Sequence, residues 1–195
     1  MTATTLDRST IVPFLARVFA ERGAEEYLGE PVTIAEHMLQ GAMLAEKEEA
    51  GDELVSAALL HDIGHFTGAF GTYSSEDTVD RHHDEEGARL LAPFFPPLIV
   101  QCVRLHVAAK RYLCATDPSY FAKLSSASVH TLSLQGGPMD AQEVAAFRLN
   151  PFHREAVKVR LWDEEGKRPG VRTPPFAHYA PMLQRVIDRH MKECV

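Results

Sequence analysis

The chain has 195 residues, a formal net charge of −7 and 45% hydrophobic residues. Its length and composition are those of a globular protein, and we predict a single domain over residues 1–195. The acidic balance disfavours a nucleic-acid binder that relies on a broad basic surface. No apolar stretch is long enough to span a membrane, and the N-terminal residues lack a signal-peptide pattern. Three cysteines without CxxC spacing suit the reducing cytoplasm, where we expect this protein.

Helical spacing of apolar residues, with capping residues and Pro or Gly at the boundaries, predicts a chain made of helices. The predicted helices cover residues 11–22, 33–49, 52–62, 83–92, 96–106, 125–134, 151–165 and 179–192, and two more begin at 117 and 140. The stretch between residues 64 and 81 is rich in Gly, Ser, Thr and acidic residues and is predicted to be a loop. No alternating strand pattern is present, so the predicted fold class is all-α.

Several of these predicted helices carry a His or an Asp at or near an end. These residues are His37, the consecutive pair His61 and Asp62, His83, His106 and, later in the chain, Asp163. A single catalytic metal rarely uses six protein ligands, because it needs an open position. A carboxylate has two oxygens, so Asp62 could bridge two metals that together use all six residues. Nitrogen and oxygen ligands without thiolate suit iron, manganese, zinc or nickel alike.

Each of these residues also has an ordinary structural interpretation. Taken alone, His37 on a helix flank is more often a satisfied core or surface histidine than a ligand. His83 follows another histidine on an acidic helix start, where both could simply be solvated. Asp163 could be a carboxylate near a helix end, although the helix dipole disfavours it there. The metal hypothesis therefore depends on the six residues taken together.

The same residues resemble the H…HD…D signature of the HD-domain superfamily, a helical bundle whose members are mostly metal-dependent phosphohydrolases. In that signature His37 is the first histidine, His61-Asp62 the central pair and Asp163 the last aspartate. A smaller branch of the superfamily uses a mixed-valent di-iron centre to activate oxygen. The segments His-Val-Ala-Ala-Lys-Arg-Tyr at 106–112 and Gln-Gly-Gly-Pro-Met-Asp at 135–140 make the chain similar to a subgroup of that branch, which cleaves 1-hydroxyphosphonates.

The resemblance implies two iron ions in the Fe(II)/Fe(III) state, with O2 as co-substrate. One iron would be held by His37, His61, Asp62 and Asp163, and the other by Asp62, His83 and His106. The phosphonate and nearby groups would be held by His65, Lys110, Ser128 and Thr131. Tyr27 and Glu30 would form a gate, in which Tyr27 occupies an iron until substrate arrives. Helix geometry agrees with one of these roles, because Lys110 lies one turn beyond His106.

Two substrates fit the resemblance: 1-hydroxy-2-(trimethylammonio)ethylphosphonate, which would give glycine betaine, and 2-amino-1-hydroxyethylphosphonate, which would give glycine. Aromatic and acidic residues gather after the His-Asp pair: Phe66, Phe70, Tyr73, Glu76, Asp77 and Asp80. A quaternary ammonium binds by cation–π and Coulomb attraction, so we expect Phe66 and Tyr73 to contact the trimethylated substrate. Ordinary anchoring of the loop by its aromatic residues is the alternative.

Two other functions compete with this hypothesis. A hydrolytic HD enzyme would release phosphate without oxygen and would not need Tyr27 or Lys110 specifically. A non-catalytic HD-like module should lack some of the ligands, yet all six positions are filled. We therefore expect an enzyme acting on a small hydroxyphosphonate, without nucleic-acid or membrane partners, and the sequence leaves its oligomeric state open.

Overall fold

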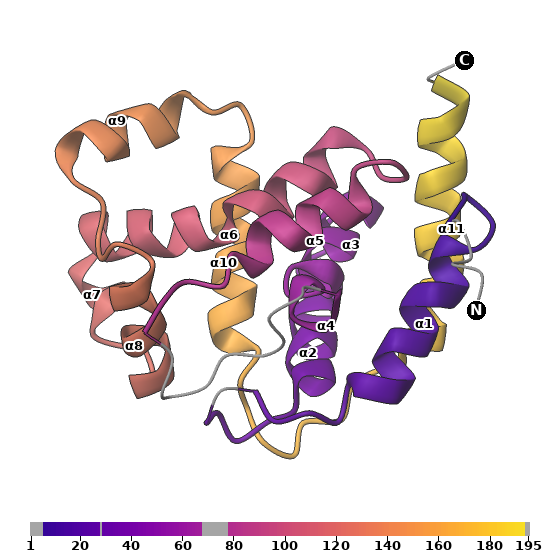
Figure 1. Cartoon of the computed structure of the whole chain (residues 1–195), viewed down its shortest axis with the longest axis horizontal. Coiled ribbons are helices and arrows are strands. Elements are labelled where there is room, and N and C mark those ends of the chain that lie inside the picture. The colour runs from indigo at the N-terminus through magenta and orange to yellow at the C-terminus, as the bar shows by residue number, and fades with distance from the viewer. Residues whose placement is uncertain (1–5, 28, 68–77, 194–195) are drawn as a thin grey trace.

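A computed structural model describes residues 6–27, 29–67 and 78–193. Its helices, in chain order, are α1 (Ile11–Arg22), α2 (Ile34–Lys47), α3 (Asp52–Leu60), α4 (Gly64–Thr67), α5 (His83–Leu91), α6 (Pro97–Thr116), α7 (Pro118–Phe121), α8 (Ser126–Leu134), α9 (Ala141–Leu149), α10 (His153–Glu165) and α11 (Phe176–Glu193) (Figure 1). Within the described ranges no strand forms, and only an isolated bridge joins Glu26 and Thr33. The predicted all-α class is confirmed.

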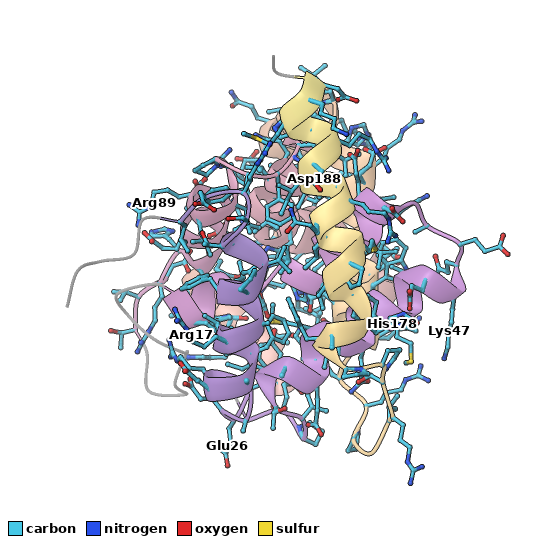
Figure 2. The ribbon with its side chains drawn as sticks, turned by 90° about the vertical axis from the view of Figure 1, so that its right-hand side faces the viewer. Arg17, Glu26, Lys47, Arg89, His178 and Asp188 are labelled. Carbon is cyan, nitrogen blue, oxygen red and sulfur yellow. The ribbon has the colours of Figure 1, made fainter. Side chains whose placement is uncertain are left out.

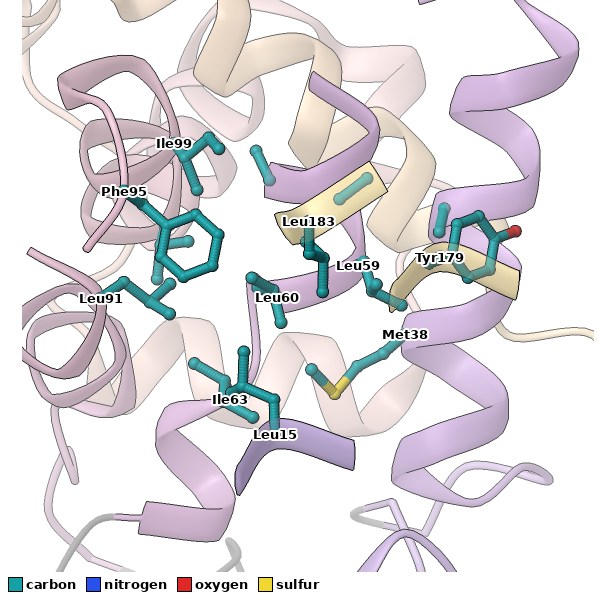
Figure 3. Close-up of a cluster of buried hydrophobic side chains, with 14 of the residues drawn as sticks. Leu15, Met38, Leu59, Leu60, Ile63, Leu91, Phe95, Ile99, Tyr179 and Leu183 are labelled. Carbon is teal, nitrogen blue, oxygen red and sulfur yellow. The ribbon is translucent and has the colours of Figure 1, made fainter. Parts of the chain in front are cut away.

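The main hydrophobic core lies between α1, α2, α3, α5, α6 and α11. Leu15, Met38, Leu60, Leu91 and Leu183, each from a different helix, are fully buried there (Figure 3). Burying one such side chain stabilises a fold by about 1.5–3 kcal/mol. The packing of this core therefore fixes the positions of the helices that surround it.

Helices α1 and α11 pack against each other on one side of the bundle (Figure 1). Their outer faces carry charged side chains such as Arg17 and Asp188, which project away from the ribbon (Figure 2). No helix among residues 6–27, 29–67 and 78–193 is long and apolar enough to cross a membrane.

Helix caps explain most of the boundaries. Thr33 and Glu36 form a capping box at the start of α2, with both reciprocal hydrogen bonds, and Asp117 caps α7. The N-cap of α3 is Gly51, and Asp52, at which the sequence predicts this helix to begin, is its first helical residue. A carboxylate favours a helix both from the N-cap and from the first turn. The sequence alone therefore does not tell which of these two positions Asp52 occupies.

Other boundaries differ from the predictions. Helix α6 continues ten residues past the expected end at residue 106, and α11 begins at Phe176 rather than at residue 179. The predicted loop over residues 64–81 opens with a helical turn, α4. In α6 the continuation carries Lys110 and Arg111 on a rigid element rather than on a loop.

Glycine makes a close approach between α4 and α5 possible. A Cβ atom placed on Gly64 would lie 1.9 Å from the carbonyl oxygen of His83 and 2.8 Å from the backbone nitrogen of Gly87. No side chain fits at these distances, so the glycine after the His-Asp pair allows the start of α5 to lie against it. The approach brings His83 to Asp62.

Candidate metal centre

His37 on α2 and His61 at the end of α3 face each other through their Nε2 atoms, 3.0 Å apart. The Nδ1 atom of His37 lies 3.1 Å from the carbonyl oxygen of Gly166, and that of His61 lies 2.8 Å from the carbonyl oxygen of Ala58. A carbonyl oxygen only accepts, so these contacts assign the proton of each neutral ring to Nδ1 and leave a lone pair on Nε2. Two lone pairs at this separation need a cation between or beside them. This pair therefore fits a metal ion.

The pKa values of these two histidines also indicate that the pair needs a positive charge. Burial acts to lower the pKa of His37, but hydrogen bonds with Asp163 and Asp62 outweigh it and raise the pKa to about 9. Burial lowers the pKa of His61 to about 4. Without a metal, a single proton on His37 would satisfy the pair, and a metal ion would replace that proton.

A second facing pair lies on the other side of Asp62. The Nε2 atoms of His83 on α5 and His106 on α6 are 3.0 Å apart, and the Nδ1 atom of His106 lies 2.7 Å from the carbonyl oxygen of Val103. The same assignment of the proton to Nδ1 leaves the lone pair of His106 directed at His83. The second pair thus offers a second place for a cation.

Asp62 faces both pairs with different oxygens. Its Oδ2 atom lies 3.5 Å from the Nε2 atoms of both His37 and His61. Its Oδ1 atom lies 3.3 Å from the Nε2 atoms of both His83 and His106. Asp62 is buried, and Oδ2 has no hydrogen-bond partner among the described residues. A buried carboxylate oxygen left in this state fits coordination to a metal.

Asp163 on α10 completes the first group. Its Oδ1 atom lies 3.4 Å from the Nε2 atom of His37 and has no hydrogen-bond partner in the described part of the chain. Its Oδ2 atom forms an ion pair with buried Arg160, whose Nε donates to the Tyr120 hydroxyl at 2.6 Å. Burial acts to raise the pKa of Asp163, but the Arg160 charge outweighs it and holds the pKa well below its usual range. One oxygen is thus left for a metal.

The structure therefore brings all six predicted ligand positions together around Asp62, from the ends or interiors of helices far apart in sequence. Two groups of buried donor atoms result: His37, His61 and Asp62 in one, and Asp62, His83 and His106 in the other. Their imidazole and carboxylate donors are of the kinds that hold a metal ion, so the two groups form a candidate metal site.

Beside this site lies a cavity that is lined partly by residues expected to hold the phosphonate. Lys110, one helical turn past His106, donates to the Thr131 hydroxyl at 2.9 Å. Ser128 and His65 also line the cavity. Burial, with the charges of Arg160 and other neighbouring groups, lowers the pKa of Lys110 to about 7. An anion entering the cavity would restore the charge on this ammonium.

The expected gate residues lie at the edge of the same cavity. The Tyr27 ring stacks on the His37 ring, with centroids 4.2 Å apart and planes 15° apart. Burial raises the pKa of the Tyr27 phenol well above its usual value, and the charges of Asp62 and Asp163 act in the same direction. Glu30 accepts a hydrogen bond from the Ser125 hydroxyl. Tyr27 thus covers the ring of one candidate ligand.

The expected aromatic contact with substrate is not supported for Phe66. Its side chain belongs to the hydrophobic core, packs edge to face on Phe19 and lies under the Arg22 guanidinium, away from the cavity lining. An apolar ring at the end of a helical turn is drawn into the core by the hydrophobic effect. Tyr73 lies outside the described residues.

The segment at 135–140 has a structural role that explains its glycines. Arg111 donates to the Gly137 carbonyl at 2.8 Å and to the Glu143 carboxylate at 2.7 Å. Gly136 and Gly137 have φ angles of +95° and +73°, which residues other than glycine rarely adopt. These contacts fix the turn after α8, the helix that carries Ser128 and Thr131.

The polar cavity-lining residues that the sequence analysis missed are Glu26, Gln135, Arg160 and Lys167. Arg160 precedes Asp163 by three residues, a spacing that predicts an ion pair on a helix and was a usable signal. Gln135 lies in a segment quoted for the resemblance, but no local pattern indicates that Gln135 or Lys167 reaches the cavity.

Residues 34–164 match the HD domain family, and they include all six candidate ligands. The chain belongs to the HD-domain family. It is 59% identical over 186 residues, 95% of both chains, to the [1-hydroxy-2-(trimethylamino)ethyl]phosphonate dioxygenase (glycine-betaine-forming) of Leisingera caerulea. It is 42% identical over 167 residues, 84% of this chain and 82% of the other, to the hydroxymethylphosphonate dioxygenase of Gimesia maris.

Proposed function

We propose that this HD-domain protein is an oxygen-dependent enzyme that cleaves the carbon–phosphorus bond of 1-hydroxy-2-(trimethylammonio)ethylphosphonate to give glycine betaine and phosphate. The observation that carries the proposal is Asp62, whose two oxygens face two separate histidine pairs at 3.3–3.5 Å. A hydrolase with one metal has no need of that arrangement. The similarity to the glycine-betaine-forming dioxygenase supports the substrate.

In this proposal His37, His61, Asp62 and Asp163 hold one iron, and Asp62, His83 and His106 hold the other. A mixed-valent Fe(II)/Fe(III) pair supplies the redox chemistry that couples O2 to oxidation at C1 of the substrate. His37, His61 and His106 keep their Nε2 lone pairs for a metal because their Nδ1 atoms donate to backbone carbonyl oxygens. Arg160 neutralises Asp163 and keeps one of its oxygens away from the metal.

The chain's other residues bind and orient the substrate. Lys110 supplies a positive charge next to the Thr131 hydroxyl, 2.9 Å away, so both reach the same phosphonate. Ser128 lies one helical turn before Thr131 and lines the same cavity. His65 is buried, with its Nε2 atom 3.8 Å from Asp62 Oδ1, on the side of the second metal. Fixing the phosphonate at one end would orient C1 toward the metal ligands.

Tyr27 and Glu30 act as the gate in this proposal. The stacked Tyr27 ring covers His37 and limits the access of water and oxygen to the metals before substrate binds. We also infer that residues 1–195 form a single HD domain, because α1 and α11, which lie outside the matched range, share its hydrophobic core. The cytoplasmic location stays a prediction.

The test is incubation of the iron-loaded protein with the trimethylated substrate, with and without O2. We expect phosphate, glycine betaine and oxygen uptake in equal amounts in air, and no phosphate under strict exclusion of oxygen. The free-amine substrate and hydroxymethylphosphonate serve as comparisons for specificity. Phosphate release without oxygen would instead indicate a hydrolase.

A further inference from the structure

We propose that Lys167 is a second phosphonate-binding cation, shared before substrate arrives between Ser128 and the gate residue Glu30, and that phosphonate binding draws Lys167 away from Glu30 and thereby releases the gate. This inference rests on the proposed function, because it takes a phosphonate as the ligand of the cavity. It adds a role for Lys167 and a coupling that the proposed function does not contain.

Lys167 follows the C-terminus of α10 and lines the cavity, with a side chain only 8% exposed. Its ammonium donates to the Ser128 hydroxyl at 2.7 Å and to a Glu164 carboxylate oxygen at 3.0 Å. A Glu30 carboxylate oxygen lies 3.6 Å away. Two of the three ammonium donors thus form hydrogen bonds, with Ser128 and Glu164, whereas Glu30 lies at ion-pair distance only.

The position beside Ser128 brings this ammonium within reach of the substrate. Ser128 is expected to donate its hydroxyl to a phosphonate oxygen, and Lys167 now contacts that same hydroxyl oxygen. An anion bound there would therefore lie next to the Lys167 ammonium as well as to Lys110. The two lysines flank α8 from different elements, Lys110 from α6 and Lys167 from the segment after α10.

The ammonium groups of Lys110 and Lys167 differ in the negative charges that lie next to them. Among the described residues Lys110 has a hydroxyl partner, Thr131, and no carboxylate within ion-pair distance, whereas Lys167 has two carboxylates. Exchange of Glu30 for a phosphonate costs Lys167 no hydrogen bond and replaces a single negative charge by a group that carries up to two. Glu164 remains in place, because Arg160 also holds it.

Release of Glu30 is transmitted to the gate through the backbone. The Glu30 backbone nitrogen donates to the Tyr27 carbonyl at 2.7 Å, so the two residues belong to one tight turn. The Glu30 carboxylate is otherwise held by the Ser125 hydroxyl, a neutral and weaker partner. Loss of its ion pair with Lys167 thus loosens the turn that keeps Tyr27 stacked on His37.

A double-mutant cycle on the iron-loaded protein tests this coupling, with methylphosphonate as the probe and titration calorimetry under anaerobic conditions as the readout. Lys167→Met should weaken binding by at least about 30-fold, as removal of a buried charge partner does. Glu30→Gln should tighten binding by about 3-fold, because a competitor for Lys167 is removed. In the Lys167→Met background, Glu30→Gln should have no such effect. Lys158→Met, at an exposed position of α10, is the matched control and should bind as wild type.

Unchanged binding by Lys167→Met, or a Glu30→Gln effect that persists without Lys167, would overturn the proposal. Should Lys167→Met fail to fold, Lys167→Gln gives the same comparison with a polar side chain of similar reach. Measuring methylphosphonate binding and substrate turnover separately distinguishes a failure of the Lys167 cation site from a failure of the proposed reaction. Binding that depends on Lys167 in a protein that forms no glycine betaine would support the cation site and contradict the proposed reaction, and no binding to wild type would overturn the cation site.

Discussion

Lys110 gives the most quantitative prediction, because it is buried on α6 without a carboxylate partner in the described structure. Burial and then the charge of Arg160 lower its pKa from 10.5 to about 7. By linkage, keeping this lysine charged in the folded protein costs roughly 4–5 kcal/mol, and local rearrangement reduces that figure. Lys110→Met fills the space without a charge. We therefore expect the variant to raise the free energy of unfolding by about 2–4 kcal/mol near pH 6.

The dependence on pH identifies the cause. Above pH 10.5 Lys110 is neutral in both the folded and the unfolded state, so the variant has no advantage; the advantage grows as the pH falls and is complete below about pH 7. Urea unfolding of the iron-loaded wild type and variant from about pH 6 to about pH 9.5 measures this trend. The exposed Lys158→Met is the control. A destabilised Lys110→Met, or a gain independent of pH, would refute the reasoning.

Three further predictions concern the metal centre. Asp62→Ala should lose both metals together, which metal analysis of the purified variant would check; retention of two irons would argue against the bridge. Gly64→Ala should separate α4 from His83, because its Cβ would overlap the His83 carbonyl, and should lower thermal stability and preferentially deplete the second metal. Arg160→Met should weaken metal affinity, measured by chelator competition, while Arg160→Lys restores part of it; equal affinities in both variants would remove the role of the Arg160 charge in orienting Asp163.

Local signals in the sequence explain the parts of the fold that were predicted correctly. A capping box such as Thr33 with Glu36 closes within one helical turn, so the residues involved are visible side by side in the sequence. Apolar spacing likewise identified α1 and α8 close to their observed bounds. The end of α6 was misplaced because its continuation carries the buried Lys110 followed by Arg111, which break an apolar pattern without breaking a helix.

The site could be predicted from the sequence only in part, because most of its contacts join residues that are far apart in the chain. His37 and Asp163 are far apart in the chain, and their proximity depends on the packing of α2 against α10. The family signature indicated that they belong together, whereas spacing alone did not. Contacts such as Lys167 with Ser128 have no local pattern at all, since the fold alone brings them together. Phe66 lies in the hydrophobic core, and its expected contact with substrate stays a prediction that the structure does not support.

Anomalous diffraction at the iron edge, from crystals of the iron-loaded protein, tests the central claim most directly. The account predicts two iron peaks on opposite sides of the Asp62 carboxylate, one beside His37 and His61 and one beside His83 and His106. A single peak, or a second peak away from Asp62, would contradict it.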